Sequence, residues 1–322
     1  MTQVSEFAEL ANVQREPKRK PIIGTAFVLT KMILLHPKAF MAYRRMRPGE
    51  QRYVRPPREY EIPPFRNDMQ YCNSKEKYLR PTRYCNPREH AVVAMANELG
   101  AYELSNYEFA DAAYWFVKDN IHFEMCALDS AGTILRRGTG SCFHYINLFV
   151  ALCRAAGIKA RYKIFAINYD RARPQPVDPL WDGMYAAIGS LAAEAEAEVC
   201  IDGSWLVGHP AVSAELQAAK DVPVTKLGED QIGVIFDAIP GTIKRSESIP
   251  LGFGWGAKMF FTLMPGSPER LSVNYLNAAA RGRQIIEEVG GREAYDRKAR
   301  MKWGLSTSVI GLKDDEALVF ED

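Results

Sequence analysis

The chain has 322 residues, 47% of them hydrophobic, and a formal net charge of +2, which is the composition of a globular protein with one large core or two modest ones. The charge argues neither for nor against nucleic-acid binding, and no nucleic-acid partner is predicted. The six cysteines form no CxxC pair, which disfavours a zinc site and a disulfide framework. No nucleotide-binding loop or flavin fingerprint is present. We therefore expect no metal, no cofactor and a reducing, cytoplasmic setting.

Residues 1–70 are predicted to form a basic and proline-rich extension. A basic tripeptide precedes the mostly apolar segment 22–35, which Lys31 interrupts and which is too short to span a bilayer comfortably. We interpret this segment as a helix that packs on the domain through one apolar stripe. The alternative is peripheral contact with a membrane or an acidic protein through residues 18–66. The prolines and arginines of residues 47–66 favour an extended path over the surface.

Helical patterns come before strand patterns along the rest of the chain. Helices are expected from Asn86-Pro87 to Gly100 and from about Asn106. Alternating residues then predict a strand at 159–168, followed by a hairpin at 196–207 that turns at Asp202-Gly203. Because helices and strands are segregated, we expect an α+β domain rather than a doubly wound sheet.

The most informative feature is a glycine-bearing loop, Gly138–Ser141, that presents Cys142 at the start of an apolar helix. This helix is expected to end at Gly157. Free backbone N–H groups and the helix dipole favour a thiolate at a helix N-terminus, so Cys142 is a candidate nucleophile. The structural alternative is a small, buried and inert cysteine.

Four segments together resemble the transglutaminase-like superfamily of papain-like cysteine enzymes, over about residues 80–212. They are the glycine-preceded cysteine, an upstream helix, the helix end before a glycine turn, and a β-hairpin: 140–142, 113–123, 152–161 and 198–205. The resemblance implies an α+β, papain/transglutaminase-like core in which the helix that bears the cysteine packs on an antiparallel sheet. It divides the chain into an extension at residues 1–70, a core at 71–215 and a C-terminal extension at 216–322.

The chain departs from the family's cysteine–histidine–aspartate order. Glu194 stands where the resemblance places the histidine, and His209 stands where it places the aspartate. The predicted catalytic residues are therefore Cys142, His209 and Glu194, with acid and base exchanged. Triads are defined by geometry and role, so this order is compatible with catalysis.

Two arrangements of the three side chains are open. In the first, which we favour, His209 contacts the Cys142 thiol and Glu194 orients the imidazole, which lowers the thiol pKa. In the second, Glu194 is nearest the thiol and its charge disfavours the thiolate. Structural alternatives also exist: Glu194 belongs to a solvated helix end at 190–197, Glu196 takes its role, or His209 is an ordinary turn residue.

Three further residues are predicted to bind substrate. His144 lies two residues after the cysteine and lines the pocket, Trp205 covers the site from the hairpin, and Gly140 belongs to the cysteine loop. Helical spacing makes Cys142 and His144 point apart, and tryptophan is more often a core residue.

The resemblance implies acyl transfer, or formation or cleavage of an amide bond, through a thioester on Cys142. We expect a small-molecule, peptide or carrier-bound acyl substrate, with biosynthesis of a small molecule as the attractive setting. The alternatives are a cysteine protease or amidase, a non-covalent cyclase that acts on a carbonyl substrate, and an inactive scaffold that retains the fold.

Overall fold

The computed structural model describes residues 34, 37, 41, 51–168, 191–230, 238, 241–263 and 266–305. The apolar segment expected at 22–35 lies outside these residues, apart from Leu34. Within the described part of the chain, no helix is long and apolar enough to cross a membrane.

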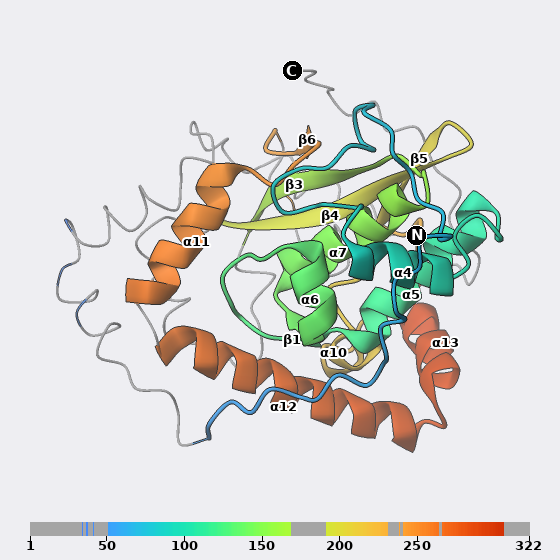
Figure 1. Cartoon of the computed structure of the whole chain (residues 1–322). Coiled ribbons are helices and arrows are strands. Elements are labelled where there is room, and N and C mark those ends of the chain that lie inside the picture. Colours follow the sequence, from blue (N-terminus) through green and yellow to red (C-terminus); the bar gives the residue numbers. More distant parts are fainter. Residues whose placement is uncertain are drawn as a thin grey trace.

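The described helices fall into one group before the sheet and a second group after most of its strands (Figure 1). The first group is α4 (His90–Glu98), α5 (Asn106–Asn120), α6 (Ala131–Arg137) and α7 (Cys142–Ala155). The second group is α10 (Ala214–Ala219), α11 (Leu251–Leu263), α12 (Gly266–Glu288) and α13 (Arg292–Trp303). This segregation confirms the α+β class.

The main sheet is antiparallel and has the strand order β5-β4-β3-β6. Its strands are β3 (Ala160–Asn168), β4 (Leu191–Ile201), β5 (Ser204–Gly208) and β6 (Lys244–Ser246). A separate two-residue ladder pairs β1 (His122–Phe123) in parallel with β2 (Thr139–Gly140).

The pairing of β4 with β5 leaves part of one strand edge open. The two strands pair from Ile201↔Ser204 to Ala197↔Gly208. Among the described residues, β4 from 191 to 196 therefore has no strand partner on its β5 side. One sequence interpretation placed Glu194 in a solvated helix end at 190–197. That interpretation is wrong, because Glu194 lies in the strand β4 and is only 8% exposed.

Each face of the sheet is covered by helices. On one face, Tyr162 of β3 and Ala197 of β4 belong to the core that contains the buried side of α7, and α4, α5 and α6 surround α7. On the other face, Phe165 packs with Leu216 of α10 and Ala278 of α12. The helix that bears Cys142 is thus held between the sheet and three other helices.

Local sequence sets the boundaries of the early helices. Ser105 caps α5 through a capping box with Glu108. The preceding helix, α4, begins at His90, later than expected, because the Asn86 side chain accepts from the amide of Arg88 and closes a turn instead of capping a helix.

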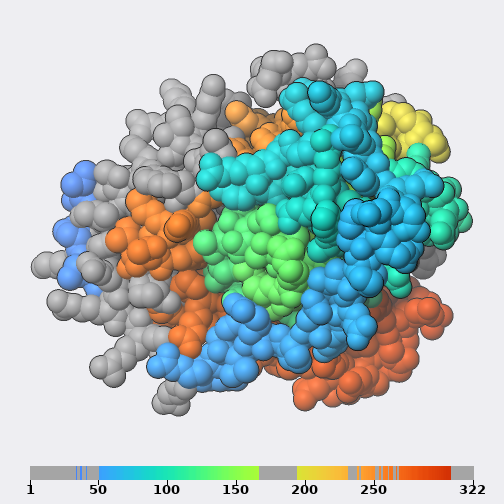
Figure 2. Space-filling view, viewed as in Figure 1, coloured from blue at the N-terminus to red at the C-terminus, as the bar shows by residue number. Residues whose placement is uncertain are grey.

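The segment from residue 51 to residue 66 contains no helix and runs across the C-terminal helix α12 and the core, as its prolines predicted (Figure 2). Arg52 pairs with Glu269 of α12 at 3.3 Å, and Arg55 forms a two-pronged ion pair with Glu124 at 2.9 and 2.8 Å. The Tyr60 hydroxyl donates to the carbonyl of Leu135 at 2.6 Å. Two of the arginines proposed to attract a partner therefore already have carboxylate partners within the chain.

Lys118 of α5 has a buried amino group with a testable effect on stability. Its side chain is 0% exposed, its Nζ donates to the carbonyl of Val212 at 2.7 Å, and burial lowers its pKa to about 7. In the unfolded chain a lysine pKa is about 10.4, so the unfolded state binds the extra proton between pH 7 and 10. We expect the Lys118 contribution to the free energy of unfolding to rise by about 1 kcal/mol per pH unit across that range.

The measurement is chemical denaturation of wild type and Lys118→Met at several pH values between 6 and 10. The difference in unfolding free energy between the two proteins should change with pH across this window and flatten below about pH 7. A difference that stays constant would show that the Lys118 pKa is ordinary.

Candidate active site

Cys142 is the first residue of α7 and follows directly after the short strand β2 and the N-cap Ser141. The backbone amides of Cys142 and Phe143 face the sulfur and act to lower the thiol pKa. These amides belong to the first turn of the helix, where backbone N–H groups have no intrahelical acceptor. The expected setting of a cysteine at a helix N-terminus is therefore present, and the residue is partly exposed.

The side chain that acts most strongly on the thiol is Glu194 of β4. The Cys142 pKa is raised well above its ordinary value, first by burial of the sulfur and then by the charge and hydrogen bond of Glu194. These effects outweigh the helix amides. The geometry therefore matches the second arrangement rather than the favoured one, and the thiol is the resting form instead of the thiolate.

His209 follows β5 immediately and lies beside Glu194, with 3.8 Å between its Nε2 and Glu194 Oε1. The residue is 1% exposed, and its backbone carbonyl accepts from the Tyr114 hydroxyl at 3.4 Å. The structure thus brings the three predicted catalytic residues into one cluster, in the order thiol, carboxylate, imidazole. Lys220, at the C-terminal cap of α10, lies within reach of the Glu194 charge. Burial lowers the Lys220 pKa, and Glu194 partly opposes that shift.

Glu196, the alternative candidate for the role of Glu194, has other partners. Its carboxylate pairs with Lys163 at 3.0 Å and is fully buried. Burial and the nearby Asp230 raise the Glu196 pKa to about 7, against the opposing effects of Lys163 and His209. Glu194 and Glu196 therefore share the vicinity of His209, and the thiol contact belongs to Glu194.

The structure places two of the three predicted substrate-binding residues near Cys142 and the third at the far end of the hairpin. Trp205 pairs with Cys200 near the hairpin turn, and its ring lies 3.8 Å from the guanidinium of Arg161. Gly140 immediately precedes Ser141, and a Cβ at this position would approach the His144 Cβ to 2.4 Å. This contact gives Gly140 a packing reason independent of substrate.

His144 is buried rather than presented to a pocket, at 1% exposure. Its Nδ1 accepts from the amide of Ser141 at 3.0 Å, and its Nε2 lies 3.0 Å from the carbonyl of Ala127. We assign the Nε2–H tautomer from these two contacts. Burial, followed by the charge of Arg137, lowers the His144 pKa to about 4, so the ring is neutral.

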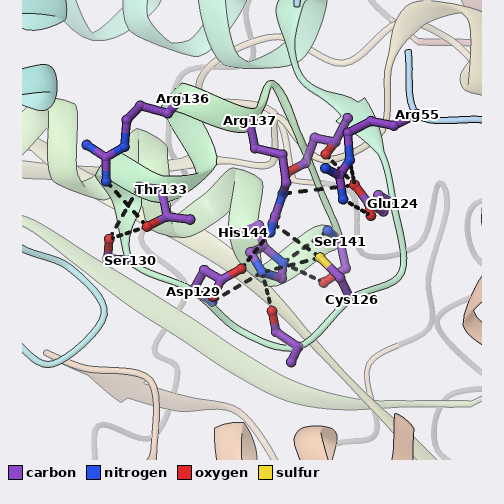
Figure 3. Close-up of polar contacts among 12 residues, drawn as sticks. Arg55, Glu124, Cys126, Asp129, Ser130, Thr133, Arg136, Arg137, Ser141 and His144 are labelled. Atoms are coloured by element: carbon purple, nitrogen blue, oxygen red, sulfur yellow. Dashed lines mark hydrogen bonds and ion pairs between the residues drawn. The ribbon is translucent and has the colours of Figure 1, made fainter. Parts of the chain in front are cut away.

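Sequence reasoning missed the polar cluster beside this ring (Figure 3). Cys126, Asp129 and His144 bring possible ligand atoms within 4.8 Å of one another. However, Arg137 donates to Asp129 Oδ2 at 2.6 Å and to Cys126 Sγ at 3.2 Å. The guanidinium thus supplies the positive charge at this place, and the donor set does not suit a metal ion. The spacing Ser141-x-x-His144, which resembles a capping box, was the available signal.

Comparison with known proteins supports the fold and the nature of the site. Residues 93–210 match the family model described as the transglutaminase-like superfamily, a range that includes Cys142, Glu194 and His209. Residues 93–210 are therefore a transglutaminase-like region of the chain, and the predicted resemblance and fold class are confirmed. The domain supports a cysteine-based enzyme.

A solved structure of a candidate cysteine protease from Cytophaga hutchinsonii is also similar, with 21% identity and a TM-score of 0.33. The match covers 52% of this chain and 49% of that one, so it spans about half of the other protein. No curated protein matches the chain.

Proposed function

We propose that the protein is a cysteine-dependent acyl transferase in which Glu194, rather than a histidine, takes the proton of Cys142. The observation that carries this proposal is the effect of the Glu194 carboxylate on the thiol at the N-terminus of α7, where both its charge and its hydrogen bonding raise the Cys142 pKa. A carboxylate beside a nucleophile is a group that can act as its general base.

The proposed reaction has two balanced steps. The Cys142 sulfur attacks the acyl carbonyl carbon while its proton passes to Glu194, and the carbonyl oxygen becomes an oxyanion. The backbone amides of Cys142 and Phe143 are the candidate donors to that oxyanion. The carbon–oxygen double bond re-forms as the leaving group departs with the proton from Glu194, which leaves a thioester.

An amine or water then attacks the thioester and gives its proton to Glu194. The carbon–sulfur bond breaks, and the proton returns to the sulfur. Because the resting thiol is protonated, the proton transfer coincides with attack instead of preceding it. His209, 3.8 Å from Glu194, positions the carboxylate for both steps. A small molecule, a peptide or a carrier-bound acyl group suits this scheme.

Replacing Cys142 with alanine tests the covalent step. Wild type incubated with the activated acyl donor p-nitrophenyl acetate should release a burst of p-nitrophenol and carry an acetyl group on the Cys142 peptide, as seen by mass spectrometry. Cys142→Ala should lose both signals. Cys72→Ala, which removes the thiol of another partly exposed cysteine residue, is the matched control. Full turnover by Cys142→Ala would rule out a thioester.

A non-covalent cyclase is the second candidate, favoured by the raised pKa of the Cys142 thiol. In that case Glu194 would exchange protons with a carbonyl substrate directly. Turnover that persists in Cys142→Ala and is lost in Glu194→Gln would identify this mechanism.

The six free cysteines accord with a reducing, cytoplasmic setting.

A further inference from the structure

The first turn of α7 is held by a network of polar contacts around His144 and Arg137 (Figure 3). The His144 ring closes the turn through its contact with the amide of Ser141, and the Ser141 hydroxyl also lies 2.9 Å from Nδ1. On its other side, Nε2–H donates to the Ala127 carbonyl at 3.0 Å. The ring thus bridges the cysteine turn and the loop at 126–129.

Arg137 fixes the same loop and the strand that leads to the cysteine. In addition to its bonds to Asp129 and Cys126, its Nε donates to the carbonyl of Thr139 at 3.0 Å. The Thr139 hydroxyl donates to Glu124, whose backbone amide donates to the Gly140 carbonyl at 2.9 Å. Every residue from Thr139 to Ser141 is therefore held by a bond to this network.

We propose that His144 and Arg137 are positioning residues that fix the cysteine turn, so that the Cys142 sulfur and the helix amides face the acyl carbon together. The proposal rests on the acyl-transfer function stated above. Its physical basis is orientation, since misplacing a nucleophile by about 1 Å costs up to about 100-fold in rate. A Cβ built on Gly140 would lie 2.4 Å from the His144 Cβ, so only glycine fits at this point of the turn.

The neutral state of His144 distinguishes positioning from proton transfer. The ring uses Nδ1 as an acceptor, and an asparagine places an oxygen at the same distance along the side chain. We therefore expect His144→Asn to retain acylation within about threefold of wild type, and His144→Phe, which has no acceptor, to lose about 10- to 100-fold. The pH profiles of wild type and His144→Asn should coincide above about pH 5, because the His144 pKa is about 4.

The test measures p-nitrophenyl acetate acylation and the rate of iodoacetamide alkylation of Cys142, both on folded protein. Arg137→Gln provides a second variant in case His144→Phe does not fold, and we expect it to slow acylation about threefold to tenfold. Arg136→Gln is the matched control, because the neighbouring Arg136 contacts Thr133 and Glu89 rather than the cysteine turn.

Two results would overturn the proposal. Acylation at wild-type rate in folded His144→Phe and Arg137→Gln would show that the turn needs neither residue. Equal loss in His144→Asn and His144→Phe would show that His144 does not act by supplying an acceptor for the Ser141 amide. Wild type could show no acylation while Cys142 alkylation is slowed more in His144→Phe and Arg137→Gln than in His144→Asn and Arg136→Gln. In that case the proposed function fails and the positioning role stands.

Discussion

Replacing Glu194 with glutamine is expected to slow acylation of Cys142 about 100- to 10,000-fold, the usual cost of removing a general base. Glutamine keeps the shape of the side chain but cannot accept the thiol proton. The same change should make the thiol easier to ionise, because the Glu194 charge and hydrogen bond both raise the Cys142 pKa. Acylation and thiol ionisation should thus move in opposite directions.

Two companion variants sharpen this test. Glu194→Asp keeps the charge, so its thiol pKa should stay above that of the glutamine variant. His209→Gln removes the imidazole and should slow acylation less than Glu194→Gln, because His209 acts through the carboxylate. Conventional cysteine–histidine chemistry requires the reverse order. A His209→Gln variant slower than Glu194→Gln would therefore restore the imidazole as the base.

The second large effect is expected on stability, at Arg154 near the C-terminus of α7. The side chain is 0% exposed, and its guanidinium donates to three backbone carbonyls. It contacts Ala160 at 3.0 and 2.8 Å, Arg80 at 3.1 Å and Glu247 at 2.7 Å. One side chain therefore joins the helix of the nucleophile to β3 and to two loops.

Arg154→Met is expected to lower the free energy of unfolding by about 3–5 kcal/mol, because it leaves the buried Ala160 carbonyl and two partly buried carbonyls without their charged donor. Arg154→Lys keeps the charge but cannot reproduce the planar set of donors, so it should also be destabilising. Urea denaturation measures both variants. Arg66→Met is the control, since Arg66 forms an exposed pair with Asp68. A loss below about 1 kcal/mol for Arg154→Met would contradict this role.

Much of the fold was predictable because local signals agreed with it. The change from helical to alternating patterns located β3, and Asp202-Gly203 marked the β4–β5 turn, where both residues have positive φ. Cys142 was found because a glycine-bearing loop before an apolar helix is a local pattern.

The relation of Glu194 to His209 was not predictable from local patterns. Which of the two side chains lies nearer the thiol depends on where β5 ends. The pairing of β5 with β4 ends at Gly208, and His209 follows it outside the paired strand. The Glu194–Glu198 alternation also suits an exposed face, yet all three glutamates of that run are buried. The contacts of His144 depend on a loop that is distant in sequence, so its positioning role emerged only from the fold.

The most direct test of the central claim is the pKa of the Cys142 thiol, measured from the rate of iodoacetamide alkylation against pH in wild type and in Glu194→Gln. If the charged Glu194 carboxylate keeps the Cys142 thiol protonated, the wild-type thiol pKa lies above the ordinary cysteine value of about 8.5 and falls in Glu194→Gln. A wild-type pKa below that value, unchanged by Glu194→Gln and raised by His209→Gln, would contradict the account.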